Sequence, residues 1–373
     1  LLIALGVIIF IPKVNEKLYY WLKDFQLPKV NKELGFILIS VVFMLIFWKF
    51  RSFMWYGDGG DLVAGFHTSN ILVTAALTWQ INHLLYALFP ISELMAIQLT
   101  HIFAGGVFVY FLLKIVDELL LSVNKKIGMF LLVMSSGFTA LFYGHIEVSG
   151  AVAAGYAGFI YYSIKYLNKK SSIVWPLVWC AIATALHFQA FALGACVVYI
   201  IWEKNKSNKK MLKDFVLAGI VFVVLMSLYA AQVYYVEWDA SPPTMSTDKY
   251  GRFGSQGGIE GRFYPLFEIK HPEEQRFTMF ERGHLIEVIN QNLLLGFPGI
   301  LLFILLFKFD IKNRKPVELF LTIMSFTYLL WSFVGTNAFH GRKDWDLFGS
   351  VTIPAAILGA YWLMKTKIEN KTL

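Results

Sequence analysis

Long, continuously apolar runs dominate this chain and predict membrane-spanning α-helices. A helix needs about 20 mainly apolar residues to cross the hydrocarbon core of a bilayer, which is roughly 30 Å thick. The runs that approach this length are 35–50, 96–115, 127–143, 149–167, 215–236, 291–308, 317–336 and 350–364. Transmembrane β-strands are shorter and alternate in polarity, so continuous runs of this kind argue against a membrane barrel.

Two further apolar stretches carry polar side chains in their interior. They are residues 69–90 and residues 173–202, the second with His187 near its middle. The apolar residues 1–11 are interpreted as the second half of another span. Together these stretches predict an all-α polytopic integral membrane protein of about 11 spans, the first one partial, in a single transmembrane domain over residues 1–373.

Composition supports a membrane protein and excludes several other classes. Hydrophobic residues make up 57% of the chain, charged residues only 16%, and the mean hydropathy is +0.58. A soluble domain carries about 25% charged residues. The chain therefore lacks the polar surface of a soluble enzyme or a disordered protein. Its two cysteines lie in apolar runs and are interpreted as small buried side chains.

The distribution of lysine predicts which loops lie in the cytoplasm and which lie outside. Cytoplasmic loops of membrane proteins carry an excess of Lys and Arg. Lysine-rich segments are 12–35, 125–126, 165–170, 203–214, 308–315 and the tail after 364, and we place them in the cytoplasm. The segments that then face outward are 51–68, 90–95, 144–148, 237–290 and 337–349.

All lysine-rich segments can lie in the cytoplasm only if two apolar stretches do not cross the membrane as single spans. Residues 69–90 have to begin and end outside, as an interfacial or re-entrant helix within a first outer loop over 51–95. Residues 173–202 have to begin and end inside, which predicts a pair of short helices with a turn near His187. One long tilted helix is the alternative, and it would place a lysine-rich loop outside. The large outer loop 237–290 is expected to order partly over an outer cavity as a lid.

Arginine is concentrated on the predicted outer side. Six of the seven arginines lie there, although outer positive charge is disfavoured in membrane proteins. The planar guanidinium binds phosphate and carboxylate groups in a bidentate manner. This bias points to an anionic ligand, with ion pairs to outer acidic residues as the alternative.

Three acidic clusters on the predicted outer side supply candidate chemistry. They are the Gly-rich segment 57–63, the short turn 144–148 and the segment 341–348. Ionisable groups at membrane depth are costly and suggest function, although loop caps or ion pairs would also explain them. The candidate residues are Asp58 and Asp61, then His145 and Glu147, then Arg342, Lys343, Asp344 and Asp346.

The sequence carries little sign of a metal or a nucleotide. His145 with Glu147, or Asp58 with Asp61, could hold a divalent cation through oxygen ligands. No HExxH motif, Cys–His zinc pattern or phosphate-binding loop is present in the sequence. A divalent cation is therefore the one cofactor left open, and no nucleic-acid partner is expected.

Several of these motifs together resemble a known superfamily. They are GDGGDL at 57–62, GHIEV at 144–148, LHFQA at 186–190, HLIEVINQNLLLGFP at 284–298 and KDWDLF at 343–348. The pattern resembles the GT-C superfamily of multi-span glycosyltransferases, and more narrowly bacterial GT-C-like proteins. These enzymes take sugars from polyprenyl-phosphate or polyprenyl-diphosphate carriers on the outer membrane face.

The resemblance implies roles for particular residues. A catalytic carboxylate in the first outer loop maps onto Asp58 or Asp61, and a phosphate-binding cation maps onto Arg342 or Lys343. Asp61 precedes an apolar stretch and could instead cap a helix, so Asp58 is the preferred general base. Further expected substrate- or phosphate-binding residues are Asp344, Asp346, His145, Glu147, His187, Arg282 and His284.

The leading hypothesis is therefore an inverting glycosyltransferase on the extracytoplasmic face of a bacterial inner membrane. Its expected partners are a lipid-linked sugar, membrane lipids and, as an open question, another membrane subunit. Two alternatives remain. One is a transporter or flippase for an anionic lipid or solute, against which the uncharged centres of 215–236, 291–308 and 317–336 argue. The other is a non-catalytic scaffold subunit of a membrane complex.

Overall fold

The fold was determined as a computed structural model, which describes ten stretches of the chain. They are residues 31–51, 59–67, 75–120, 122–206, 212–224, 227, 263–270, 276–308, 313–335 and 345–366. Within these stretches the regular elements are helices, and the single β-bridge pairs Phe263 with Gly335. The expected all-α architecture is confirmed for the part of the chain that the structure describes.

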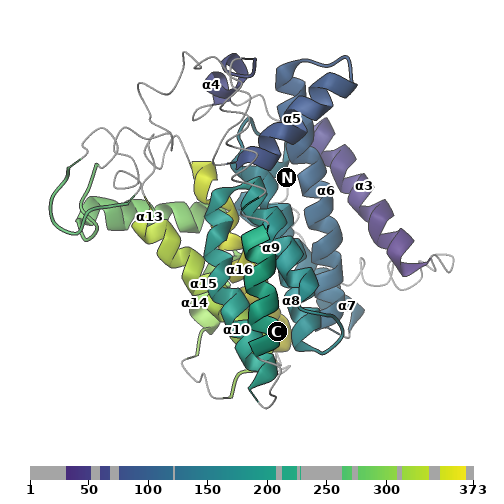
Figure 1. Ribbon diagram of the computed structural model, residues 1–373, viewed down its shortest axis with the longest axis vertical. Helices are drawn as coiled ribbons and strands as arrows, with labels where there is room; N and C mark the ends of the chain where they lie inside the picture. The colour runs from purple at the N-terminus through teal and green to yellow at the C-terminus, as the bar shows by residue number, and fades with distance from the viewer. Residues whose placement is uncertain are drawn as a thin grey trace, which may run out of the picture.

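Helices make up most of the stretches that the structure describes. The α-helices are α3 (Lys32–Lys49), α4 (Gly59–Ala64), α5 (Ala76–Leu88), α6 (Glu93–Leu119), α7 (Val123–Met134), α8 (Val152–Leu167), α9 (Val174–Leu186), α10 (Gly194–Asn205), α13 (Arg282–Gly296), α14 (Gly299–Leu306), α15 (Pro316–Val334) and α16 (Ile353–Lys365). Short 3-10 helices are η2 (Gly137–Phe142), η3 (Ser149–Ala151), η4 (Phe188–Leu193) and η5 (Trp345–Thr352). Figure 1 shows the longer helices gathered side by side into a bundle.

Helix α6 organises one half of this bundle. It packs against α3, α5 and α8, and α8 in turn packs against α9. The other half depends on α16, which packs closely on α14. At that crossing a Cβ on Gly299 would lie 2.4 Å from the Ala356 Cα, so only glycine permits the two backbones to approach this closely.

Two helices among the described residues are long and apolar enough to cross a membrane by themselves. They are α6 and α15, and the bent pair α13–α14 would count as a third if it forms one span. Apolar side chains of α3, such as Leu38, Val42 and Leu45, are exposed on the outer surface of the bundle, as expected for contact with lipid. These features confirm a helical membrane protein, and the number of about 11 spans stays a prediction.

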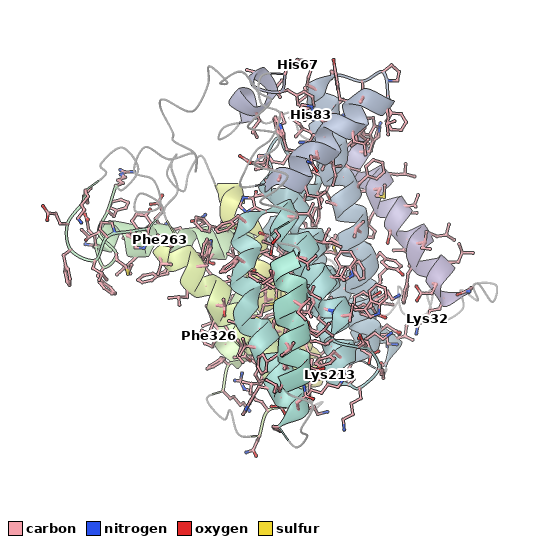
Figure 2. The ribbon with its side chains drawn as sticks, in the orientation of Figure 1. Lys32, His67, His83, Lys213, Phe263 and Phe326 are labelled. Carbon is pink, nitrogen blue, oxygen red and sulfur yellow. The ribbon has the colours of Figure 1, made fainter. Side chains whose placement is uncertain are left out.

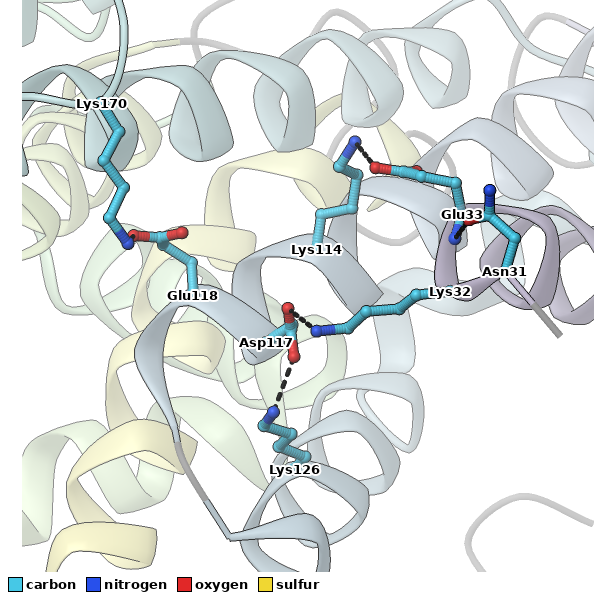
Figure 3. Close-up of polar contacts among 8 residues, drawn as sticks. All are labelled: Asn31, Lys32, Glu33, Lys114, Asp117, Glu118, Lys126 and Lys170. Atoms are coloured by element: carbon cyan, nitrogen blue, oxygen red, sulfur yellow. Dashed lines mark hydrogen bonds and ion pairs between the residues drawn. The ribbon is translucent and has the colours of Figure 1, made fainter. Parts of the chain in front are cut away.

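One end of the bundle carries a network of ion pairs (Figure 3). Asp117, near the C-terminus of α6, accepts from Lys32 at 2.5 Å and from Lys126 at 2.6 Å. Lys170 pairs with Glu118 at 2.5 Å, and Lys365 pairs with Glu318 at 2.5 Å. The lysine-rich loops that the sequence places on one side therefore do meet at one end of the structure.

Residues 174–205 form the helical pair that the charge pattern predicts. Helix α9 ends at Leu186, and His187 adopts an extended backbone that interrupts the helix. At the far end of α10, Lys204 Nζ donates to the carbonyl of Ser171 at 3.5 Å, just before α9 begins. The chain therefore returns to its starting end, which confirms the turn near His187 and excludes one long helix.

The apolar run 291–308 does not form one continuous helix. Helix α13 already begins at Arg282, and α14 leaves it at 111° after a break at Phe297 and Pro298. Proline has no N–H to donate and disfavours helical backbone in the residue before it. Gly296, Phe297 and Pro298 therefore end α13, and the chain resumes in a new direction at Gly299.

Three other expected helices are shorter than their apolar runs. The run 127–143 is α-helical only to Met134, 149–167 only from Val152, and 350–364 only from Ile353. The remaining residues of these runs fall mainly in η2, η3 and η5, which pack on one another through η5. Hydrophobicity predicted the runs correctly, but it carries no information on where α-helix gives way to 3-10 turns.

Candidate active site

Helix η5 is the meeting point of segments that lie far apart in the sequence. It contacts η2, η3, α13 and α15. It is also joined to η4, because Gln189 Nε2 donates to Ser350 Oγ at 2.7 Å in a buried hydrogen bond. The segments after His145, His187 and His284 and the segment containing Asp346 therefore come together, as the hypothesis of one shared site requires.

This meeting point lies away from the ion-pair end of the bundle. Figure 2 labels His67 and His83 at one end and Lys32 and Lys213 toward the other. His67 Nε2 lies 2.6 Å from Glu93 Oε1, at the N-terminus of α6, whereas the ion pairs of Asp117 and Glu118 lie near its C-terminus. We call the end near His67 and the N-terminus of α6 the histidine end.

The Gly-rich segment lies directly on the turn 144–148. A Cβ on Gly59 would come within 2.7 Å of the Ile146 carbonyl oxygen, closer than real Cβ contacts allow. Ile146 and Val148 share a buried apolar cluster with Leu62 and Phe66, which follow Gly59. The structure therefore brings together two of the three acidic clusters that the sequence predicts.

The candidate side chains of the turn 144–148, which the sequence assigns to an outer loop, are buried within the protein. His145 is 3% exposed and Glu147 is 4% exposed. Gly144 has a φ of +68°, a left-handed conformation that favours glycine and allows the sharp change of direction. The Glu147 carboxylate accepts from the backbone N–H of Val148 at 2.6 Å. Both candidate side chains lie inside the protein, beneath the Gly-rich segment.

Arg51 supplies positive charge beside this turn. Its Cβ lies 3.3 Å from the position that a Cβ on Gly144 would take. The guanidinium lies over the ring of Trp48 at 4.2 Å from the ring centroid, and Nη1 donates to the Trp48 carbonyl at 3.1 Å. The sequence identified Arg51 as one of the outer arginines but did not assign it to the site.

His187 has a structural contact at the turn of its helical pair. Its Nδ1 accepts from the backbone N–H of Gln189 at 3.3 Å. Helix α5 covers the same turn, because Thr78 Oγ1 donates to the Leu186 carbonyl at 2.7 Å. His187 therefore lies at the turn between the two helices, as the sequence predicts, and its side chain is buried.

The two candidates at the start of α13 differ in environment. Arg282 is exposed, whereas His284 is fully buried. His284 Nε2 lies 2.8 Å from the carbonyl oxygen of Phe333, and the Tyr264 ring centroid lies 3.9 Å from the imidazole centroid. His284 and Tyr264 line a small hollow, and Arg282 is not part of its lining.

Tyr264 is a residue that sequence reasoning missed. Its backbone N–H donates to the Val334 carbonyl at 2.9 Å, beside the bridge between Phe263 and Gly335. Burial raises the pKa of Tyr264 to about 12, and the Glu287 carboxylate adds to this rise. The phenol therefore stays protonated at neutral pH. The sequence of 237–290 gives no pattern that would distinguish this tyrosine from its neighbours.

Several predicted site residues are not tested. Asp58, Arg342, Lys343 and Asp344 lie outside the described residues. For Asp61 in α4 and Asp346 in η5, the structure describes the backbone and not the side chain. Their roles therefore stay predictions. Across the described stretches, no cluster of three or more His, Cys, Asp or Glu side chains could hold a metal ion.

Comparison with known proteins identifies the fold. No protein-family model matches the chain, and no curated protein matches it in sequence. Among solved structures, ArnT from Cupriavidus metallidurans bound to undecaprenyl phosphate is similar, with a TM-score of 0.57 and 12% sequence identity over 89% of this chain. The apo state of the same protein gives a TM-score of 0.55 and 13% identity.

The similarity is one of fold. This chain spans about 60% of the length of ArnT. At such low identity the comparison shows that this chain shares the fold of ArnT, and it does not transfer a substrate or a catalytic residue.

Proposed function

We propose that this chain is a glycosyltransferase that takes its sugar from a polyprenyl-phosphate carrier. The observation that carries the proposal is the contact of the Gly-rich acidic segment with the buried turn 144–148, beside Arg51. In this proposal the acidic residues of the Gly-rich segment act together with the Arg51 guanidinium at one end of a GT-C-like fold. The similar ArnT structure contains undecaprenyl phosphate, which suggests the carrier.

Asp58 acts as the general base in this proposal. It takes the proton of the acceptor hydroxyl while the hydroxyl oxygen forms a bond to the anomeric carbon of the sugar. The bond between that carbon and the phosphate oxygen breaks, and the carrier leaves as polyprenyl phosphate. Attack from the face opposite the leaving group inverts the anomeric centre. Such a base typically contributes about 10²- to 10⁴-fold to the rate.

Positive charge stabilises the departing phosphate. Arg51, Arg342 and Lys343 are the proposed cations, because negative charge grows on the phosphate oxygen as the sugar leaves. A guanidinium that lies over an aromatic ring, as Arg51 does over Trp48, is held in one orientation. The proposed reaction lies at the histidine end, on the extracytoplasmic face of a bacterial inner membrane, with Glu147 and Asp346 placing the acceptor.

The proposal is tested with purified protein in lipid nanodiscs. The protein is mixed with undecaprenyl-phosphate hexoses and pentoses, with a lipid and glycan extract of bacterial envelopes as the source of acceptor. Release of undecaprenyl phosphate is followed by thin-layer chromatography. Release that depends on the protein and on the extract supports the proposal. A protein that only moves these lipids between the two leaflets of a liposome would be a flippase, and the proposal would be wrong.

A further inference from the structure

A small hollow beside η5 combines buried polar groups with aromatic side chains. It lies between α13, the end of α15, η5 and the segment that begins at Phe263, which Figure 2 labels beside α13. The space is about 10 Å³, which is room for one water-sized group. Its side chains include Tyr264, His284, Glu287, Gln291, Ser332 and Phe348.

One face of α13 provides the polar lining. His284, Glu287 and Gln291 are spaced by three and four residues, so they project from the same side of the helix. A polar stripe of this kind is unusual in a helix that also exposes Ile286, Ile289 and Leu294. The apolar side chains cover another face, and the polar side chains are directed into the protein.

His284, which lines the hollow, has one ring nitrogen left as a hydrogen-bond acceptor. The carbonyl of Phe333 can only accept, so the Nε2 atom 2.8 Å away carries the hydrogen. In a neutral imidazole the other nitrogen, Nδ1, is then an acceptor. Nδ1 is buried and has no hydrogen-bond partner among the described residues.

Gln291 presents the complementary group. Its side chain is 7% exposed, and its Nε2 donor has no partner within the part of the chain that the structure describes. A buried donor left unpaired costs about 1–3 kcal/mol. One hydroxyl group can donate to an acceptor such as His284 Nδ1 and accept from a donor such as Gln291 Nε2.

We propose that this hollow is a subsite for a hydroxyl group of a neutral saccharide. Tyr264 and Phe348 line the hollow beside these polar groups and give the entering hydroxyl an apolar wall. A phosphate is disfavoured, because the lining contains a carboxylate and neither Lys nor Arg among the described residues. His284 is thus assigned to a sugar and not to the phosphate of the carrier.

The subsite adds a sugar-binding contact to the proposed function. It rests on that function only for the identity of the saccharide that occupies the hollow. Because the space admits one hydroxyl, the sugar binds by an edge, and the rest of the ring lies outside beneath the segment of Tyr264. Affinity for a single sugar is therefore expected to be weak, and selectivity is expected to depend on the orientation of one hydroxyl group.

The test measures sugar binding without turnover. Saturation-transfer NMR is recorded on the protein in nanodiscs with methyl glycosides of glucose, galactose, mannose, N-acetylglucosamine and arabinose. At least one glycoside is expected to bind to the wild type. Gln291→Met removes the donor with little change of shape and should weaken that binding about five- to tenfold, the effect of one lost hydrogen bond.

A control variant outside the hollow and a second variant inside it complete the test. Asn290→Met changes the exposed neighbour on the same helix and should leave binding unchanged. His284→Phe removes the acceptor and keeps a ring of similar size, so it should weaken binding by a similar factor. If no glycoside binds, or if both pocket variants bind as tightly as the wild type, the hollow holds only water and the proposal is overturned.

The outcomes also separate the subsite from the proposed reaction. A wild-type protein that binds a glycoside through Gln291 but releases no undecaprenyl phosphate would retain the subsite and exclude the glycosyltransferase. Sugar transfer with an unchanged KM in Gln291→Met would retain the reaction and exclude the subsite.

Discussion

The two ends of the helical bundle use charge in opposite ways. At the ion-pair end, Asp117, Glu118 and Glu318 each meet a lysine at 2.5–2.6 Å, and these contacts are partly open to solvent. Away from that end, His145, Glu147 and His284 are buried. Burying an ionisable group is costly, whereas an exposed ion pair contributes little to stability. The charges of the ion-pair end therefore fit the lysine bias of cytoplasmic loops, whereas the buried ionisable side chains are better explained by a role in binding or catalysis.

The backbone differs between the two ends as well. Regular α-helices begin or finish at the ion-pair end, as the C-terminus of α6 and the N-terminus of α7 do around Asp117. At the histidine end the chain runs through η2, η3, η4 and η5. Irregular backbone at membrane depth is tolerated where it is buried in protein or lines a cavity. Its concentration around the candidate site is consistent with a binding function there.

Labelling of introduced cysteines tests whether the two ends lie on opposite sides of the membrane. Lys206→Cys places a thiol near the ion-pair end, and Gln256→Cys places one in the predicted outer loop. We expect a membrane-impermeant maleimide to label position 256 in intact cells and position 206 only after lysis. Equal labelling of both positions in intact cells would contradict the charge-based topology.

The contact of the Gly-rich segment with the turn 144–148 can be tested by adding one carbon. Gly59→Ala places a Cβ 2.7 Å from the Ile146 carbonyl, which forces the two segments apart. We expect sugar transfer to fall by at least tenfold, because displacement of a catalytic group by about 1 Å can cost 10²-fold. The assay is initial-rate release of undecaprenyl phosphate.

Gly35→Ala is the matched control for that variant. It lies in α3, and no atom lies within 4 Å of the added carbon. Transfer at the wild-type rate is expected, with equal or slightly higher stability, since alanine is the better helix former. Equal rates for Gly59→Ala and Gly35→Ala would mean that the packing of Gly59 does not position the reaction.

A smaller effect is expected at the ion-pair end. Asp117→Asn removes the charge that pairs with Lys32 and Lys126. Because Lys32 is largely exposed and the pairs are screened by solvent, we expect a loss of about 1 kcal/mol or less in unfolding free energy. Thermal unfolding in detergent should shift by at most a few degrees, and sugar transfer should not change. A loss of transfer would show that this end is coupled to the reaction.

The sequence predicted those features that depend on local pattern. Lysine placement led to the turn near His187, and the Lys204–Ser171 contact confirms it. The break between α13 and α14 was missed, although Gly296, Phe297 and Pro298 carry a strong stop signal. The apolar run continues on both sides of Pro298, so hydrophobicity alone does not reveal the break between the two helices.

Other features depend on tertiary contacts that no local pattern encodes. The burial of His145 and Glu147 results from α4 packing over their turn, which Gly59 permits. The hollow beside His284 needs Tyr264, which lies 20 positions earlier in the sequence and on a different segment. The spacing of His284, Glu287 and Gln291 on one helical face was visible in the sequence, and it could have pointed to a polar site on α13.

The most direct measurement of the central claim compares Asp58→Asn with Asp61→Asn in the transfer assay. The amide keeps the shape of the carboxyl group and removes the oxygen that takes the proton. We expect Asp58→Asn to fold, to bind undecaprenyl phosphate, and to lose about 10²- to 10⁴-fold in the rate of transfer. Asp61→Asn should mainly reduce thermal stability. Transfer by Asp58→Asn at the wild-type rate would contradict Asp58 as the base and remove the main support for the proposed mechanism.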